Sequence, residues 1–62
     1  MKTITSATIT KITRNLTDFG YDGLTAEEVQ KAVDNVVEGE KPTDIVGMFV
    51  KRMLVENGYI ED

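Results

Sequence analysis

The acidic side chains are the main candidates for chemistry in this sequence, because its 62 residues include no histidine and no cysteine. Those two residue types supply most proton shuttles, activated nucleophiles and zinc ligands at neutral pH. Adjacent carboxylates such as Glu27 and Glu28 point about 100° apart on a helix, and Glu38 and Glu40 flank a glycine in an expected loop. We therefore expect these carboxylates to be solvated surface charges, with no catalytic residue, no cofactor and no enzymatic activity.

One acidic segment has some features of a calcium-binding loop. Asp18, Asp22 and Gly23 would fall at positions 1, 5 and 6 of an EF-hand. Position 3 would be Gly20 and position 12 would be Val29, and neither residue supplies the side-chain oxygen required there. The glycine spacing also matches no phosphate-binding loop. We therefore predict no metal site.

The basic residues near the start of the chain suggest contact with nucleic-acid phosphates. The net charge is −4, but residues 1–17 carry +3 from Lys2, Lys11 and Arg14. Such residues contact phosphates when the first helix of a DNA-binding motif crosses the backbone. A small helix-turn-helix-type DNA-binding protein that uses these three residues is our alternative hypothesis. The four basic and eleven acidic residues after position 17 argue against it, because they give that part a charge of −7.

Apolar residues in the first third of the sequence recur at steps of three, four and three, which is typical of one stripe of a helix. Many threonines stand in the same segment, and their β-branched side chains favour extended structure. We predict a helix over about residues 6–19 with Ser6 as its N-cap, and extended or frayed residues 2–5. The predicted core stripe is Ile9, Ile12, Leu16 and Phe19.

The start of a second helix is marked by a capping box, in which the side chains of Thr25 and Glu28 bond each other's backbone N–H groups. Leu24 and Val29 have the spacing of a hydrophobic staple around that box. We predict a helix over about residues 26–38. Its expected buried face consists of Val29, Ala32, Val33 and Val36.

A third helix is predicted over about residues 44–57. Pro42 prevents the chain from being helical before it, and Thr43 or Asp44 is the expected N-cap. Gly47 lies inside this helix and costs about 1 kcal/mol relative to alanine, so it needs a reason such as the close approach of another helix. We expect the approaching helix to come from this chain or from a second copy of it.

Glycines follow each of the three predicted helices, at Gly20, Gly39 and Gly58. This placement is typical of the left-handed residue that ends a helix, and after the last of them Tyr59 would pack on Leu54. The sequence therefore predicts an all-α fold, a compact three-helix bundle with short extended ends, in one domain over residues 1–62. No apolar segment follows the first residues, and about 18 apolar residues never run together. We expect a cytoplasmic protein without membrane contact.

The third helix carries more apolar residues than one buried stripe needs. Flexible methionines beside an aromatic residue are common at protein-binding surfaces. We expect part of this helix to contact another protein or a second copy of the chain. The candidate contact residues are Met48, Phe49, Val50, Met53, Val55 and Tyr59.

Two resemblances to known proteins concern residues 24–60. Residues 24–29 (Leu-Thr-Ala-Glu-Glu-Val), together with residues 44–60, resemble small uncharacterised helical proteins of actinobacteria and their phages, which implies no particular activity. Residues 54–60 (Leu-Val-Glu-Asn-Gly-Tyr-Ile) are similar to the end of a winged-helix recognition helix, where a helix passes through glycine into the first wing strand. The printed sequence ends where that wing would begin.

A different segment resembles ubiquitin-associated three-helix domains. Residues 16–21, followed by residues 29–33, match the first loop and second helix of that family, with Phe19-Gly20-Tyr21 in place of its usual Met-Gly-Phe. The resemblance implies that these three residues form a loop that contacts a partner. Our main functional hypothesis is a small non-enzymatic binding or regulatory protein, phage-derived if the first resemblance holds, that acts through its third helix.

Overall fold

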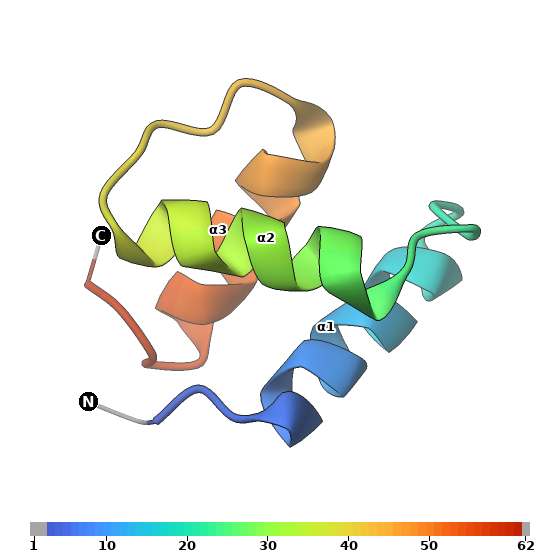
Figure 1. Ribbon diagram of the computed structural model, residues 1–62, viewed down its shortest axis with the longest axis horizontal. Coiled ribbons are helices and arrows are strands. Elements are labelled where there is room, and N and C mark those ends of the chain that lie inside the picture. Colours follow the sequence, from blue (N-terminus) through green and yellow to red (C-terminus); the bar gives the residue numbers. More distant parts are fainter. Residues whose placement is uncertain (1–2, 62) are drawn as a thin grey trace.

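The computed structural model describes residues 3–61, which form three helices joined by two seven-residue connectors (Figure 1). Helix α1 spans Ser6–Asp18, α2 spans Ala26–Val37 and α3 spans Ile45–Glu56, and none of the described residues lies in a strand. All three helices pack against one another. The predicted ranges 6–19, 26–38 and 44–57 agree to within one residue at each end, the usual margin for helix boundaries. The all-α three-helix bundle is therefore confirmed.

Helix α1 is capped by Thr5. The Thr8 backbone N–H donates to Thr5 Oγ1 at 3.4 Å, and the Thr5 N–H donates to Thr8 Oγ1 at 3.2 Å, which makes a reciprocal capping box. Thr8 is only 6% exposed, and its hydroxyl also donates to the Tyr59 Oη at 3.3 Å. The prediction that Ser6 is the N-cap is wrong, because the residue three positions after it is Ile9, whose side chain cannot complete such a box.

Three further threonines in α1 adapt to the helix by bonding to its backbone. The hydroxyls of Thr10, Thr13 and Thr17 each donate to the carbonyl oxygen four residues earlier, at 3.0, 2.8 and 3.1 Å. A threonine side chain that bonds in this way satisfies its own polar group inside the helix. The threonine-rich segment is therefore helical from residue 6, in spite of its preference for extended structure.

The other two helix starts follow the sequence signals. The Glu28 N–H donates to Thr25 Oγ1 at 3.2 Å, and the Thr25 N–H donates to Glu28 Oε1 at 3.1 Å, so the predicted capping box is confirmed. Asp44 caps α3, because its Oδ1 accepts the Gly47 N–H at 2.7 Å. Leu24 is half-buried and packs against the core beside the fully buried Val29, as expected for a hydrophobic staple.

Each of the three helices is followed by a glycine with a positive φ angle. After α1 and α3, Gly20 and Gly58 have φ angles of +100° and +79°, a region that residues with a Cβ rarely adopt. The following residues, Tyr21 and Tyr59, each donate their N–H to the carbonyl five residues earlier at 2.9 Å. Both tyrosines are half-buried and pack against the core. The predicted helix ends are confirmed, but residues 57–60 form a turn and bend in place of the short extended end that we expected.

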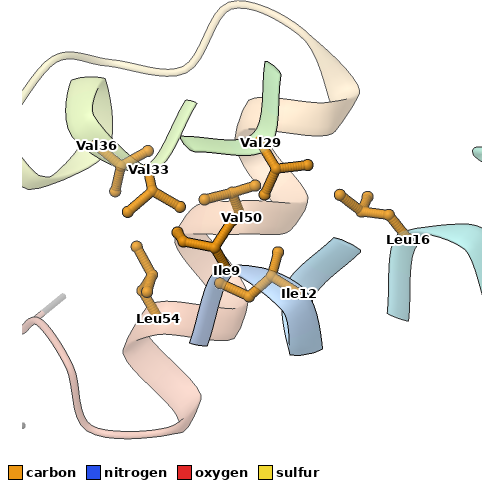
Figure 2. Close-up of a cluster of buried hydrophobic side chains, with 8 residues drawn as sticks. All are labelled: Ile9, Ile12, Leu16, Val29, Val33, Val36, Val50 and Leu54. Carbon is orange, nitrogen blue, oxygen red and sulfur yellow. The ribbon is translucent and has the colours of Figure 1, made fainter. Parts of the chain in front are cut away.

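The core consists of eight aliphatic side chains that gather between the helices (Figure 2). Helix α1 contributes three of them, α2 contributes three and α3 contributes two. They are Ile9, Ile12, Leu16, Val29, Val33, Val36, Val50 and Leu54.

Phe19 does not belong to this core, and its predicted place in the buried stripe is wrong. Its side chain is 71% exposed, whereas Leu16, one helical turn earlier, is fully buried. Phe19 is the C-cap of α1, where the chain leaves the helix axis and turns at Gly20. The periodicity of the stripe therefore stops one residue too early to bury it. Tyr21, two residues later, is the aromatic residue that packs against the core.

Gly47 lies close to the cap of its own helix. A Cβ at this position would lie 3.0 Å from Asp44 Oδ1 and 3.1 Å from Pro42 Cβ. Both distances are shorter than ordinary van der Waals contact. Within residues 3–61, no other helix supplies this close approach, because the nearest atoms belong to the connector that leads into α3. The approach of a helix from a second copy stays a prediction.

Candidate functional site: the outer face of α3

Helix α3 divides its apolar residues between the core and solvent. Gly47, Val50 and Leu54 are buried on one side. Ile45 and Met48 are 61% and 57% exposed, and residues three or four apart are neighbours on a helix surface. Phe49 follows Ile45 by four positions and is half-buried, because part of its side chain packs against the core. The first two turns of α3 therefore present an apolar surface formed by Ile45, Met48 and the uncovered part of Phe49.

Phe19 extends this surface from the end of α1. Its ring lies 5.1 Å from that of Phe49, measured between ring centroids, and the two planes meet at 69° in an edge-to-face arrangement. We call the four residues together the apolar patch. It consists of Phe19, Ile45, Met48 and Phe49.

The structure places the six predicted contact residues in different environments. Met48 is exposed, and Phe49 and Val55 are half-buried on α3. Val50 is fully buried in the core, so its inclusion as a contact residue is wrong. It lies five residues after Ile45, on the side of the helix that packs against the core.

Two of the predicted contact residues also have roles inside the fold. The Met53 sulfur accepts a hydrogen bond from the Asn15 side-chain amide at 3.8 Å, which joins α3 to α1. The Tyr59 hydroxyl accepts from Thr8, which joins the C-terminal turn to the start of α1. Ile45 and Phe19 are exposed but were not among the six predicted contact residues, although the resemblance to ubiquitin-associated domains implies that Phe19 contacts a partner. The signal for Ile45 was present in the sequence, because it precedes Met48 by three positions and Phe49 by four.

A groove adjoins the apolar patch and shares Met48 with it. Its volume is about 430 Å³, and it is bounded by α3 and the middle of the α2–α3 connector. Arg52 and Glu56 form an ion pair across one turn of its rim, with 3.6 Å between Nε and Oε1. We call it the cationic groove. Its lining residues are Lys41, Pro42, Met48, Lys51, Arg52, Val55 and Glu56.

The residues of the DNA-binding alternative are only partly brought together. Lys11 and Arg14 are exposed on α1, and Lys2 lies outside the described residues. The hydroxyl hydrogens of Thr8, Thr10 and Thr13 already donate within the protein, as described above. Both connectors have seven residues, whereas a helix-turn-helix motif uses a turn of about three or four.

A second depression lies between α2 and the α2–α3 connector, with a volume of about 540 Å³. Two of its three acidic residues, Glu28 and Asp44, accept hydrogen bonds as part of the helix caps. Across residues 3–61, no group of three or more acidic side chains is arranged to hold a metal ion. Within the same residues, none of the helices has the length and apolar character needed to cross a bilayer.

Comparison of the chain with protein-family models, with curated proteins and with solved structures found no match. The resemblances to actinobacterial and phage proteins, to winged helices and to ubiquitin-associated domains therefore stay predictions.

Proposed function

We propose that this chain is a small non-enzymatic binding protein that contacts a protein partner through the apolar patch on α3. The observation that carries the proposal is the exposure of Phe19, Ile45 and Met48, which are 71%, 61% and 57% accessible and adjoin the half-buried Phe49. Contiguous apolar surface of this kind marks interaction sites on small proteins. The absence of histidine and cysteine from the sequence supports a role other than catalysis.

The patch is suited to a transient complex. Full burial of a large apolar side chain contributes about 1.5–3 kcal/mol, so the exposed parts of Phe19, Ile45 and Met48 together supply about 3–6 kcal/mol. That total is an upper bound, since binding also costs translational freedom and side-chain ordering. A dissociation constant of about 1 μM corresponds to about 8 kcal/mol. The patch therefore needs additional polar contacts to reach micromolar affinity.

Affinity capture with matched variants tests the proposal. The tagged chain, an Ile45→Glu/Met48→Glu variant and a Val37→Glu variant are each exposed to extract from cells that make the protein, and bound proteins are quantified by mass spectrometry. Val37 is the matched control, because it is an apolar residue on α2 with 51% exposure. Circular dichroism checks that all three chains are folded.

We expect at least one protein to be recovered equally by the wild type and by Val37→Glu, and to be reduced at least tenfold on the patch variant. Equal recovery on all three chains would show that the patch is not the binding surface. Sedimentation velocity of the same three chains identifies the case in which the partner is a second copy.

The DNA-binding alternative rests on a smaller set of observations. Lys11 and Arg14 are exposed and three residues apart on α1, so both can reach the same stretch of phosphates. Two phosphate contacts give a slope of about −1.8 in the logarithm of affinity against the logarithm of salt concentration. Titration with duplex DNA at 50 and 200 mM salt tests it, with Lys11→Gln/Arg14→Gln as the variant that should abolish the salt dependence.

A further inference from the structure

The lining of the cationic groove combines apolar side chains with basic ones. Its apolar lining residues are Pro42, Met48 and Val55, and Lys41, Lys51 and Arg52 supply positive charge around them. Because Met48 also belongs to the apolar patch, a partner that lies on the patch reaches the groove without a break in the contact.

The charge of this groove contrasts with the charge of the chain. Three of the seven basic residues line it, but only one of the eleven acidic residues, Glu56, does so. The Arg52–Glu56 pair does not remove this excess, since the two side chains are 79% and 60% exposed and the pair spans one helical turn. Exposed pairs of this type are weak and are screened by salt. A local charge of +2 therefore stands on a chain whose net charge is −4.

This charge argues against a second copy of the chain as the occupant of the groove. A two-fold dimer places the same surface of each copy against the other, so the excess positive charge of one groove would be brought close to that of the other.

The dimensions of the groove favour a short segment. Met48 and Val55 are seven residues apart, which corresponds to about 10 Å along a helix axis, or two turns. A partner helix of similar length presents apolar side chains at i, i+3 or i+4, and i+7 on one face. Acidic residues beside those positions would meet the lysines and the arginine of the rim.

We propose that the cationic groove and the adjoining apolar patch bind an acidic amphipathic peptide segment of a partner protein. Apolar side chains of that segment pack on Pro42, Met48 and Val55, and its carboxylates pair with Lys41, Lys51 and Arg52. This inference rests on the proposed function, because it names the chemistry of the partner that the same face of α3 binds.

Selection from a random 16-residue display library on the full-length wild-type chain tests the inference. The selected peptides are synthesised with a fluorescent label, and their dissociation constants are measured by anisotropy at 50 and 300 mM salt. Four chains are compared: the wild type, Lys51→Glu/Arg52→Glu, Met48→Glu, and the control Lys11→Glu/Arg14→Glu, which reverses two exposed charges on α1. Lys51→Gln/Arg52→Gln replaces the charge reversal if that variant does not fold by circular dichroism.

We expect the selected peptides to carry net negative charge together with two or more apolar residues at helical spacing. Their dissociation constants should rise at least tenfold on Lys51→Glu/Arg52→Glu and on Met48→Glu, less than twofold on the control, and severalfold at the higher salt concentration.

Neutral or basic peptides, or a failure to select any peptide, would overturn the inference. Peptides that lose binding on Met48→Glu but not on the charge-reversed chain would also overturn it, while leaving the proposed function intact. Peptides that are indifferent to both changes would count against both proposals. Duplex DNA that binds more tightly than any peptide, and depends on Lys51 and Arg52, would assign the groove to nucleic acid instead.

Discussion

Replacement of Gly47 by alanine sets two effects of similar size against each other at the start of α3. Alanine is favoured over glycine inside a helix by about 0.8–1 kcal/mol. The added Cβ would lie 3.0 Å from Asp44 Oδ1 and 3.1 Å from Pro42 Cβ, so both groups must move by a few tenths of an ångström. Pro42 is part of the α2–α3 connector, and the Asp44 Oδ1 accepts a hydrogen bond from the Gly47 N–H at 2.7 Å. A shift of the Asp44 oxygen away from the new Cβ would lengthen this hydrogen bond and weaken the cap.

We expect the crowding to outweigh the helix preference. Overpacking costs about 1–3 kcal/mol, and loss of an N-cap costs about 0.5–2 kcal/mol. After subtraction of the alanine preference, Gly47→Ala should lower the free energy of unfolding by about 1 kcal/mol. In a domain of this size that change lowers the melting temperature by about 4–8 °C.

Thermal and urea unfolding, followed by circular dichroism, measure this effect. The same substitution is then made in an Asp44→Ala background, where the contact with Oδ1 no longer exists. There Gly47→Ala should cost at least about 0.5 kcal/mol less, because only the contact with Pro42 opposes it. A higher melting temperature for Gly47→Ala in the wild type, or an equal cost in both backgrounds, would refute the steric explanation.

Two other pairs of substitutions give different tests, each measured by urea unfolding. Leu16→Ala should lower the free energy of unfolding by about 2–5 kcal/mol because it leaves a cavity in the core. Phe19→Ala should lower it by only about 0.5–1.5 kcal/mol, because only the edge contact with Phe49 is lost. Similar losses for the two variants would mean that Phe19 is buried after all. Thr8→Val should cost about 1–2 kcal/mol, because it removes half of the capping box and the bond to Tyr59. Thr10→Val, which removes only an exposed bond to the Ser6 carbonyl, should change stability by less than about 0.5 kcal/mol, so equal effects of the two threonines would contradict the role given to Thr8.

The sequence was sufficient to predict features that depend on local chemistry. The capping box of Thr25 and Glu28, the Asp44 cap and the glycines after each helix involve residues within five positions of one another, and the structure confirms them. Strong local signals of this kind need no knowledge of tertiary packing.

The local sequence pattern was not sufficient to place Phe19 or to explain Gly47, because each residue lies at a helix end or beside another segment. Phe19 continues the spacing of the buried stripe but stands at the C-cap, directly before the turn at Gly20, and its side chain is exposed. Tyr21 could have been identified as the packed residue instead, from the rule that was applied to Tyr59. The contact of Gly47 with Pro42 depends on how the connector folds back, which no periodicity reveals.

The candidate site was predicted in outline only. The excess of apolar residues in the third helix indicated a surface, and Met48 and Phe49 belong to it. The inclusion of Val50 was wrong, since the angle at which α3 packs on the other helices decides which side is buried. The contribution of Phe19 and the grouping of Lys41 with Lys51 and Arg52 bring together residues from different segments.

The central claim, that the outer face of α3 binds a protein partner, is tested most directly by nuclear magnetic resonance. The ¹⁵N-labelled chain is titrated with the captured partner, and the displacement of each backbone amide signal is recorded. We expect the largest displacements at the apolar patch, from Ile45 to Phe49 and at Phe19. Displacements concentrated around Lys11 and Arg14 on α1, with the amides of α3 unchanged, would contradict it.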